Sequence, residues 1–198
     1  MLCLVLAATL ALAGSPLTST DLATAYDDVP IVRVARRVGI LNPDLAMALA
    51  SREVPMDVKA AIVNALGWST MGRDNAGIFL DFMAVRYRRD RESMRRVWRR
   101  VLSPSELFVL GYLHALDDPA QAARAIPILE RAARRMPESY TVALVGALVQ
   151  AQTASGDDIC EGWRRVAAID AAPRRERDLR PAARAAVLGA VRADCPSR

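Results

Sequence analysis

The side chains that most often carry out catalysis are sparse in this chain of 198 residues. His114 is the only histidine, so the chain has neither a metal site built from several histidines nor a spare partner for a Ser-His-Asp triad. The ten glycines are scattered and form no phosphate-binding loop. We therefore interpret His114 as a helix-surface or groove residue, and we expect no enzymatic activity, no metal ion and no cofactor.

Cys160 and Cys195 are the residues with the clearest prospect of covalent chemistry. Cys160 lies in the first turn of a predicted helix that ends near residue 171, and Cys195 follows the next predicted helix, residues 181–191. In an antiparallel hairpin, the start of one helix lies beside the end of the next. We expect the two thiols to form a disulfide if the protein is exported to an oxidising compartment. The alternative is two unrelated thiols.

Positive charge is concentrated between residues 86 and 100, within a chain of formal net charge +5. Arg95, Arg96, Arg99 and Arg100 form two rows with i, i+4 spacing and have few acidic neighbours. Outside the cytosol, such a face favours anionic lipid head groups or an acidic partner. We expect no nucleic acid as a partner. The alternative is a solvated arginine face without a function.

The elements that position these residues are predicted to be α-helices. The chain is 53% hydrophobic but only 5% aromatic, it is rich in alanine, and it lacks the alternating pattern of strands. The clearest pair lies in residues 103–137. Ser103 and Glu106 form a capping box at its start, and Asp118 followed by Pro119 begins a second helix that ends before Pro137. A tight link between two amphipathic helices predicts an αα-hairpin.

The second half of this hairpin resembles a tetratricopeptide repeat. The resemblance rests on two small alanines, a large apolar residue between them and a terminating proline, namely Ala125, Leu129, Ala132 and Pro137. It covers about one repeat and implies antiparallel helical hairpins stacked as a short α-solenoid, whose concave surface binds a protein or peptide. We expect Tyr112 and His114 to lie on the exposed, partner-binding face of the hairpin. Pro127 should kink the second helix or shift its start.

The segments on either side predict more short helices. Those before the hairpin cover residues 30–38, 43–52, 55–67, 75–89 and 90–102, and the last two could form one kinked helix. Residues 139–153 are apolar on most of their circumference, which predicts burial between neighbours on both sides. Gly146 in this helix should let a partner backbone approach closely. The final helix would be the polar-faced cap of the stack.

The chain divides into three predicted parts. Residues 1–13 are an apolar run that is too short to span a bilayer but suits a signal peptide cleaved near Ala13. Residues 14–29 should form a flexible leader, and residues 30–198 a single α-helical repeat domain. We expect an exported protein, periplasmic or extracellular. Because no basic residue precedes the apolar run, a cytoplasmic protein with a hydrophobic N-terminus, or a start codon further upstream, remains an alternative.

These features predict an exported, non-enzymatic scaffold or adaptor that binds a protein or peptide through a concave surface. The alternative is an adaptor that docks on a membrane surface or an anionic partner through the arginine-rich helix, residues 86–100. An enzyme would require His114 to be buried beside a carboxylate in a pocket. The sequence leaves the partner and the oligomeric state open.

Overall fold

The computed structural model describes residues 15–67, 73–153, 160–173, 176–193 and 195, and its described elements are all helical, as expected. The only strand-like contact among these residues is an isolated bridge between Ser139 and Glu176. The predicted signal peptide, residues 1–13, lies outside the described residues. The elements are α1 (Pro16–Ser19), η1 (Ala23–Tyr26), α2 (Pro30–Val38), α3 (Pro43–Ala50), α4 (Met56–Gly67), α5 (Asn75–Arg86), α6 (Arg91–Val101), α7 (Pro104–Asp117), η2 (Pro119–Ala125), α8 (Ile126–Arg135), α9 (Tyr140–Thr153), α10 (Glu161–Ala171) and α11 (Pro181–Ala193).

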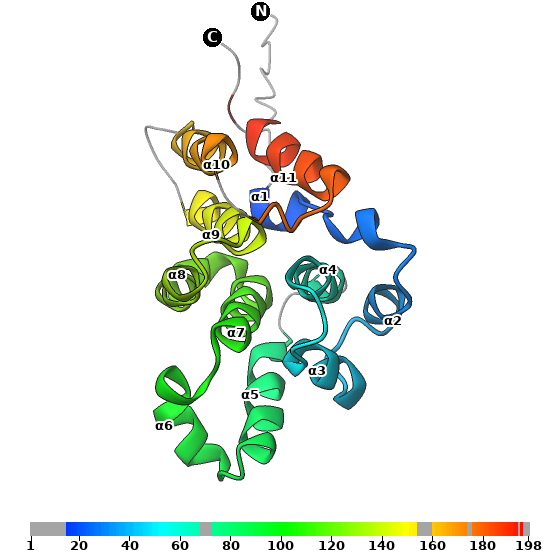
Figure 1. Cartoon of the computed structure of the whole chain (residues 1–198), viewed down its shortest axis with the longest axis vertical. Helices are drawn as coiled ribbons and strands as arrows, with labels where there is room; N and C mark the ends of the chain where they lie inside the picture. The colour runs from blue at the N-terminus through cyan, green and yellow to red at the C-terminus, as the bar shows by residue number, and fades with distance from the viewer. Residues whose placement is uncertain (1–14, 68–72, 154–159, 174–175, 194, 196–198) are drawn as a thin grey trace, which may run out of the picture.

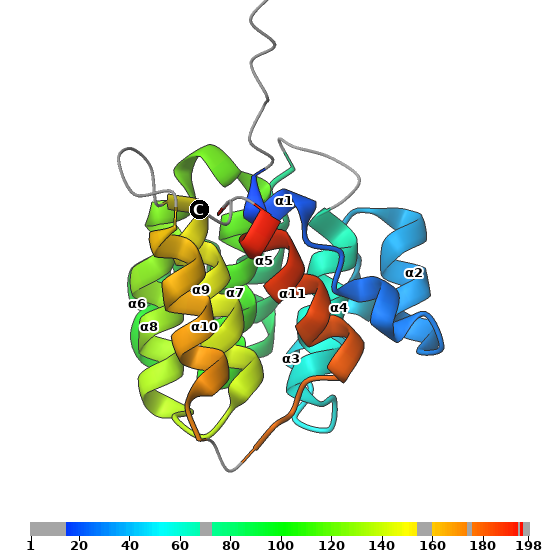
Figure 2. The same ribbon diagram turned by 90° about the horizontal axis from the view of Figure 1, so that it is seen from above.

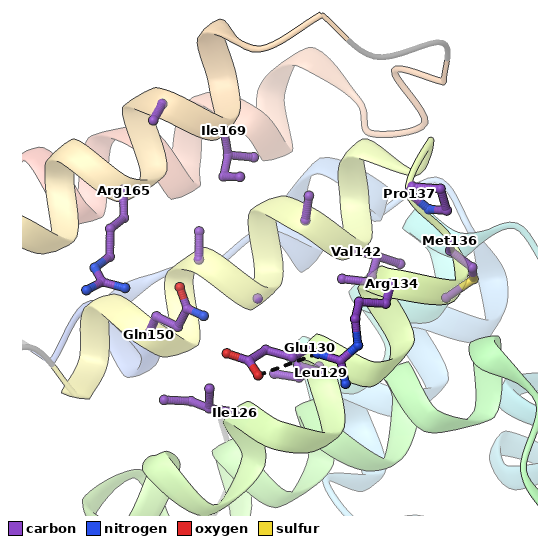
Figure 3. Close-up of a pocket in the computed structure, with 15 residues that line it drawn as sticks. Ile126, Leu129, Glu130, Arg134, Met136, Pro137, Val142, Gln150, Arg165 and Ile169 are labelled. Atoms are coloured by element: carbon purple, nitrogen blue, oxygen red, sulfur yellow. Dashed lines mark ion pairs between the residues drawn. The ribbon is translucent and has the colours of Figure 1, made fainter. Parts of the chain in front are cut away.

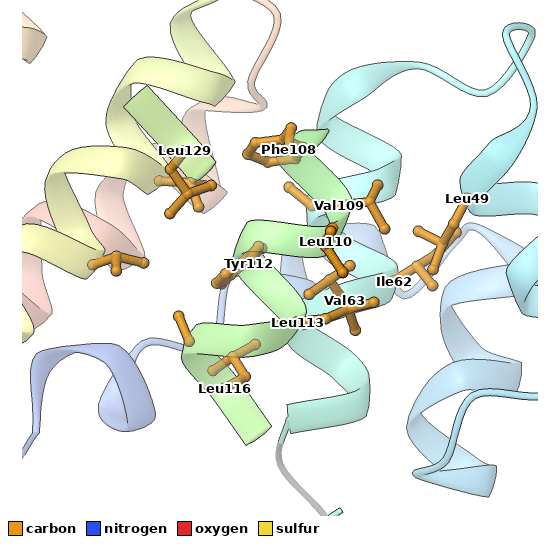
Figure 4. Packing of buried hydrophobic residues seen from close by; sticks show 14 of the residues in the cluster. Leu49, Ile62, Val63, Phe108, Val109, Leu110, Tyr112, Leu113, Leu116 and Leu129 are labelled. Atoms are coloured by element: carbon orange, nitrogen blue, oxygen red, sulfur yellow. The ribbon is translucent and has the colours of Figure 1, made fainter. Parts of the chain in front are cut away.

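Helix α7 lies at the centre of the helices (Figure 1) and is buried along most of its length. It packs against α4 and α5 on one side and against α8, η2 and α9 on the other. Figure 4 shows its side chains reaching toward Val63 of α4 and toward Leu129 of α8. The predicted capping box begins the helix, since Ser103 N donates to Glu106 Oε2 at 2.7 Å and Glu106 N donates to Ser103 Oγ at 3.3 Å.

Pro127 shifts the start of the second helix of the hairpin, one of the two outcomes expected from its position. Residues 119–125 form the 3₁₀ helix η2, and α8 begins only at Ile126. Proline cannot donate the hydrogen bond that a helix interior requires, but it is well suited to the first turn. The chain therefore starts a new helix at this residue instead of running through it.

Helices α5 and α6 are separate, which resolves an alternative that the sequence left open. Helix α5 ends at Arg86, and Arg88 adopts a φ of 51° between the two helices. Asp90 then caps α6, because its carboxylate accepts a hydrogen bond from Ser93 N at 2.8 Å. The chain changes direction between the two helices without a glycine or a proline, and α6 packs against α5.

Helix α9 is buried on most sides, as its apolar circumference predicts, between α8 and α10. The expected close approach at Gly146 is wrong, because a Cβ built there would meet no atom within 4 Å. The close approach occurs at Gly162 of α10, where a Cβ would lie 2.8 Å from the Cβ of Ala151 in α9. Gly146 faces open space instead.

The segment expected to be a flexible leader is packed into the core, so that expectation is wrong for residues 16–26. Leu17, Leu22 and Tyr26 are fully buried. Helix α1 contacts α9 and α11, while η1 contacts α4 and α11. Figures 1 and 2 both show this N-terminal segment beside α11. The apolar residues of this Ser-, Thr- and Asp-rich stretch therefore pack against helices from the middle of the chain, α4 and α9, and against its last helix, α11.

Helices α10 and α11 pack as neighbours and are joined by the expected disulfide between Cys160 and Cys195, whose Cα atoms are 4.8 Å apart. Near the disulfide, the guanidinium of Arg192 lies 5.3 Å from the centre of the Trp163 ring. At the other end of the pair, Arg184 Nε donates to Asp170 Oδ1 at 2.5 Å. The two helices are thus connected at both ends. None of the helices in the described ranges has the length and apolar character needed to cross a bilayer.

Candidate functional site

An apolar groove of about 540 Å³ lies over α9, between α8 and α10 (Figure 3). We call it the α9 groove, and its lining residues are Ile126, Leu129, Glu130, Ala133, Arg134, Met136, Pro137, Val142, Ala143, Gly146, Ala147, Gln150, Arg165, Ala168 and Ile169. Ala143, Gly146 and Ala147 form its floor at i, i+3 and i+4 spacing, so they lie on one face of α9. Because these residues are small, they leave the space above this face of α9 empty. Larger side chains at the same positions would fill the groove.

The walls of the α9 groove are apolar, and its edges carry charge. Figure 3 shows Ile126 and Leu129 projecting from α8 and Ile169 from α10. Glu130 and Arg134 of α8 pair at 3.8 Å, and Arg165 reaches from α10 toward Gln150. The described lining contains no hydroxyl, thiol, imidazole or amine that could act as a nucleophile. The groove is therefore suited to binding an apolar surface.

Tyr112 does not lie on an exposed face, so its expected role in partner binding is wrong. The residue is fully buried, and its hydroxyl accepts a hydrogen bond from Asn64 Nδ2 at 3.2 Å. Burial raises the pKa of this phenol. The physical reason is that α7 is covered on both sides, which leaves no free hairpin face at this position.

His114 is half-buried and lines a depression of about 460 Å³ together with Asp74 and Asp117. Burial lowers its pKa, and the charge of Asp74 raises it in part. Both carboxylates have structural partners, because Asp117 accepts from Ala76 N at 2.7 Å and Asp74 accepts from Gly77 N at 2.8 Å. No hydrogen bond between described residues joins the imidazole to either carboxylate. Both carboxylates thus accept hydrogen bonds from the first turn of α5.

Arg95, Arg96, Arg99 and Arg100 are exposed on α6, as the sequence predicts. Arg96 donates to Glu92 Oε1 at 2.6 Å, and the Arg99 guanidinium lies 5.1 Å from the centre of the Trp98 ring. Within the described part of the chain, Arg95 and Arg100 have no acidic partner. These four arginines therefore lie together on α6, and none of them lines the α9 groove.

A buried amine forms a further polar cluster. Lys59, 2% exposed, donates from Nζ to Ser105 Oγ at 2.5 Å. Burial lowers its pKa to about 8, while the nearby Glu106 carboxylate raises it. Glu106 in turn accepts a hydrogen bond from Tyr87 OH at 2.8 Å. Because Lys59 belongs to α4 and Ser105 and Glu106 belong to α7, we interpret the cluster as a connection between these two helices.

The α9 groove is the site that sequence reasoning missed. Its signal was the set of small residues at helical spacing in an otherwise bulky α9, of which only Gly146 was noted, as a place where a partner backbone could approach closely. Among the residues that the structure describes, no group of three histidine, cysteine or carboxylate side chains is arranged to hold a metal ion. Comparison of the chain with protein-family models, curated proteins and solved structures found no match.

Proposed function

We propose that this protein is an exported, non-enzymatic adaptor that binds an amphipathic helix of a partner protein in the α9 groove. The observation that carries the proposal is the apolar groove of about 540 Å³ over the small residues of α9. Its volume lies within the range of natural binding pockets, about 300–1,000 Å³. Burial of apolar surface would supply the binding free energy.

The shape of the groove favours a helix as the occupant. The floor extends from Val142 to Gln150, which corresponds to about 12 Å along α9 at the rise of an α-helix. This length accommodates about two turns of a partner helix, with apolar anchors at i, i+3 or i+4, and i+7. The small floor residues allow the partner backbone to come close, as Gly162 does within the molecule.

The net charge of the chain favours an acidic occupant. Each wall places an arginine at the edge, Arg134 from α8 and Arg165 from α10, and each pairs with a glutamate of its own helix, Glu130 and Glu161. The whole chain carries a formal net charge of +5. A partner helix with carboxylates beside its apolar face would therefore match this surface and be attracted to it.

Within this proposal, only helices α7 to α10 are stacked as in a tetratricopeptide repeat protein. Each of these helices packs on the next, which supports a local stack of two hairpins. The contact of α1 with α9 and α11 is not a feature of a simple open array, because the first and last parts of the chain meet. Export is supported by the disulfide, since disulfides persist in oxidising compartments.

A pair of glycine substitutions tests the groove. A Cβ meets no atom within 4 Å at Gly146 in the groove or at Gly189 on α11, so a side chain can begin at either position without a clash at its Cβ. The probe is a fluorescent amphipathic peptide with leucines at i, i+4 and i+7 and flanking glutamates, compared with a lysine-flanked version and a scrambled version. We expect the glutamate-flanked peptide to bind the parent and Gly189→Leu alike, and Gly146→Leu at least about tenfold more weakly, or 1.4 kcal/mol.

Fluorescence anisotropy measures these affinities, and thermal unfolding of each variant confirms that the fold is retained. Equal binding by Gly146→Leu and Gly189→Leu would reject the groove as the site. The absence of binding by all peptides, or a preference for the lysine-flanked peptide, would reject the proposed acidic helix.

A second candidate function is an adaptor that docks on a membrane surface or an anionic partner through the arginine-rich segment 86–100, most of which forms α6. Arg95 and Arg100 favour it, because both are exposed and neither has an acidic partner among the residues that the structure describes. Ionic strength separates the two functions. Binding through exposed arginines should fall steeply between low and physiological salt, whereas binding in the groove, which rests mainly on apolar burial, should fall much less.

A further inference from the structure

A further depression, of about 250 Å³, is lined by residues of α6, η2 and α8. Figure 1 shows α6 and α8 on the same side of the molecule. We call this depression the arginine pocket. Its lining comes from three elements and consists of Trp98 and Arg99 of α6, Arg124 of η2, and Pro127, Ile128, Arg131 and Arg134 of α8. Four guanidinium groups therefore surround a small concave surface, and the described lining contains no carboxylate.

Most of this charge is uncompensated. Arg134 has Glu130 at 3.8 Å, but no hydrogen bond or ion pair between described residues joins Arg99, Arg124 or Arg131 to an acidic side chain. Like charges held close together repel each other even when water screens them. A bound anion would remove this repulsion and gain charge-assisted hydrogen bonds.

The pocket is built on packed structure rather than on isolated surface side chains. Ile128 at its base is 7% exposed, and the cation–π contact with Trp98 positions Arg99. Arg135 Nη1 donates to the carbonyl of Leu102 at 3.2 Å, which connects the end of α8 to the end of α6. Arg131 and Arg134 lie on the same face of α8, since they follow Pro127 at i+4 and i+7.

We propose that the arginine pocket binds a terminal phosphate group. A phosphomonoester carries about −1.5 to −2 charges at neutral pH, which matches several uncompensated arginines better than the single charge of a carboxylate. Guanidinium groups also bind phosphate oxygens in a bidentate geometry. The volume is below the range of about 300–1,000 Å³ typical of pockets for whole ligands, so the pocket fits a head group. Trp98 and Pro127 offer apolar contact to the carbon side of the ester.

This proposal goes beyond the function of the α9 groove and does not depend on it. Helix α8 separates the two sites, with Ile126 and Leu129 toward the groove and Pro127 and Ile128 toward the pocket. Arg134 lines both and is therefore left unchanged in the test. The phosphate group can belong to a free phosphorylated molecule or to a lipid with a phosphomonoester head group, and the experiment distinguishes these sources.

Two double variants with the same loss of charge test the pocket. Arg124→Gln with Arg131→Gln removes two guanidinium groups from the lining, whereas Arg37→Gln with Arg52→Gln removes two exposed ones outside it. Isothermal titration of the full, oxidised chain with inorganic pyrophosphate measures binding. We expect the pocket variant to bind at least about tenfold more weakly than the parent and the control variant to remain within about twofold.

Vesicles identify the source of the phosphate. Phosphatidylcholine vesicles are mixed with phosphatidic acid, a phosphomonoester lipid, or with phosphatidylglycerol, a phosphodiester lipid, at equal surface charge. Co-sedimentation with phosphatidic acid alone, lost in the pocket variant, assigns the site to a lipid head group. Pyrophosphate binding without vesicle binding assigns it to a free phosphorylated molecule.

Three results would overturn the proposal. Pyrophosphate does not bind the parent, both double variants lose the same affinity, or both anionic lipids recruit the protein equally. The last two results would show that only general positive charge is involved. Far-UV circular dichroism and thermal unfolding of both variants establish that a loss of binding is not a loss of folding.

Discussion

Asn64 shows how one buried polar side chain connects segments that are distant in sequence. Its Oδ1 accepts a hydrogen bond from Ala23 N at 3.0 Å, and its Nδ2 donates to the carbonyl of Thr20 at 2.9 Å and to Tyr112 OH. The amide therefore provides the partners that the backbone of the N-terminal segment needs after burial. Lys59 and Asp117 play similar parts at other helix junctions. These buried polar side chains connect the helices of the described chain.

Asp117 should make stability depend on pH in the direction opposite to that of an ordinary paired carboxylate. Burial raises its pKa to about 6 from the usual 3.8, although hydrogen bonds from Ala76 and Asn75 lower it in part. The folded state therefore binds the proton more tightly than the unfolded state. The resulting stabilisation is present below pH 4 and is lost as the pH rises to about 6.

The variant Asp117→Asn should lack this dependence. Relative to the parent, we expect its free energy of unfolding to rise by about 1–2 kcal/mol between pH 4 and pH 6.5, after allowance for the partial exposure of the carboxyl group. Urea denaturation of both proteins at the two pH values measures the difference, in which the titration of the other carboxyl groups cancels. A difference that does not change with pH would show that Asp117 has an ordinary pKa in the folded protein.

At the scale of elements, α8 has a separate role on each of its faces. One face forms a wall of the α9 groove, and another bears arginines that line the arginine pocket beside α6. Its third face packs on α7, where Gly111 allows close contact with Leu129. Pro127 contributes by starting α8 at Ile126, which sets the register that determines which residues face each depression.

The pair α10 and α11 should lose stability without losing its fold when the disulfide is removed. Cys160 and Cys195 close a loop with a sequence separation of 35 residues. The chain-entropy model gives a contribution of about 3–4 kcal/mol for such a loop. The contacts of Asp170 with Arg184 and of Trp163 with Arg192 do not depend on the thiols and should keep the helices in place.

Urea denaturation with and without reductant measures this contribution. Reductant should shift the midpoint of the parent to that of the variant Cys160→Ser with Cys195→Ser, and it should leave the variant unchanged. Circular dichroism should show the same helix content in all samples. If reduction has no effect on the midpoint of the parent, the disulfide does not form in the folded protein.

At the scale of the whole molecule, the two ends of the described chain meet. Arg180, just before α11, donates from its backbone N to Tyr26 OH at 3.1 Å, and its side chain pairs with Asp28 at 2.5 Å. Tyr26 OH also donates to Asp57 Oδ2 at 2.9 Å, which adds α4 to the same junction. The N-terminal segment therefore connects the start of α11 to α4.

Removal of this segment should destabilise the protein strongly. A chain of residues 30–198 lacks the fully buried Leu17, Leu22 and Tyr26, and it leaves Asn64 without its backbone partners. Each large apolar side chain contributes about 1.5–3 kcal/mol on burial, so we expect a net loss of at least about 3 kcal/mol after the cost of ordering the segment. Thermal and urea unfolding of residues 30–198 and of residues 14–198 make the comparison. Equal midpoints would mean that the segment does not pack on the core in solution.

The sequence alone determined the local features of this protein. The starts of α6 and α7 follow from Asp90 and Ser103, which supply the hydrogen bonds that free N–H groups at a helix start require. Pro127 set the start of α8 by the geometry of its own ring. These effects involve residues within a few positions of one another, so the printed sequence contains all the groups that decide them.

Only the tertiary structure decided which surfaces remain open. Tyr112 is covered because α4 and α9 both pack on α7, and Gly146 is open because α8 and α10 stand apart over α9. Leu17 and Tyr26 gain their partners from α9, α11 and α4, more than thirty residues further along the chain. Burial depends on contacts between distant segments, and a helical pattern specifies an apolar face without specifying what will cover it.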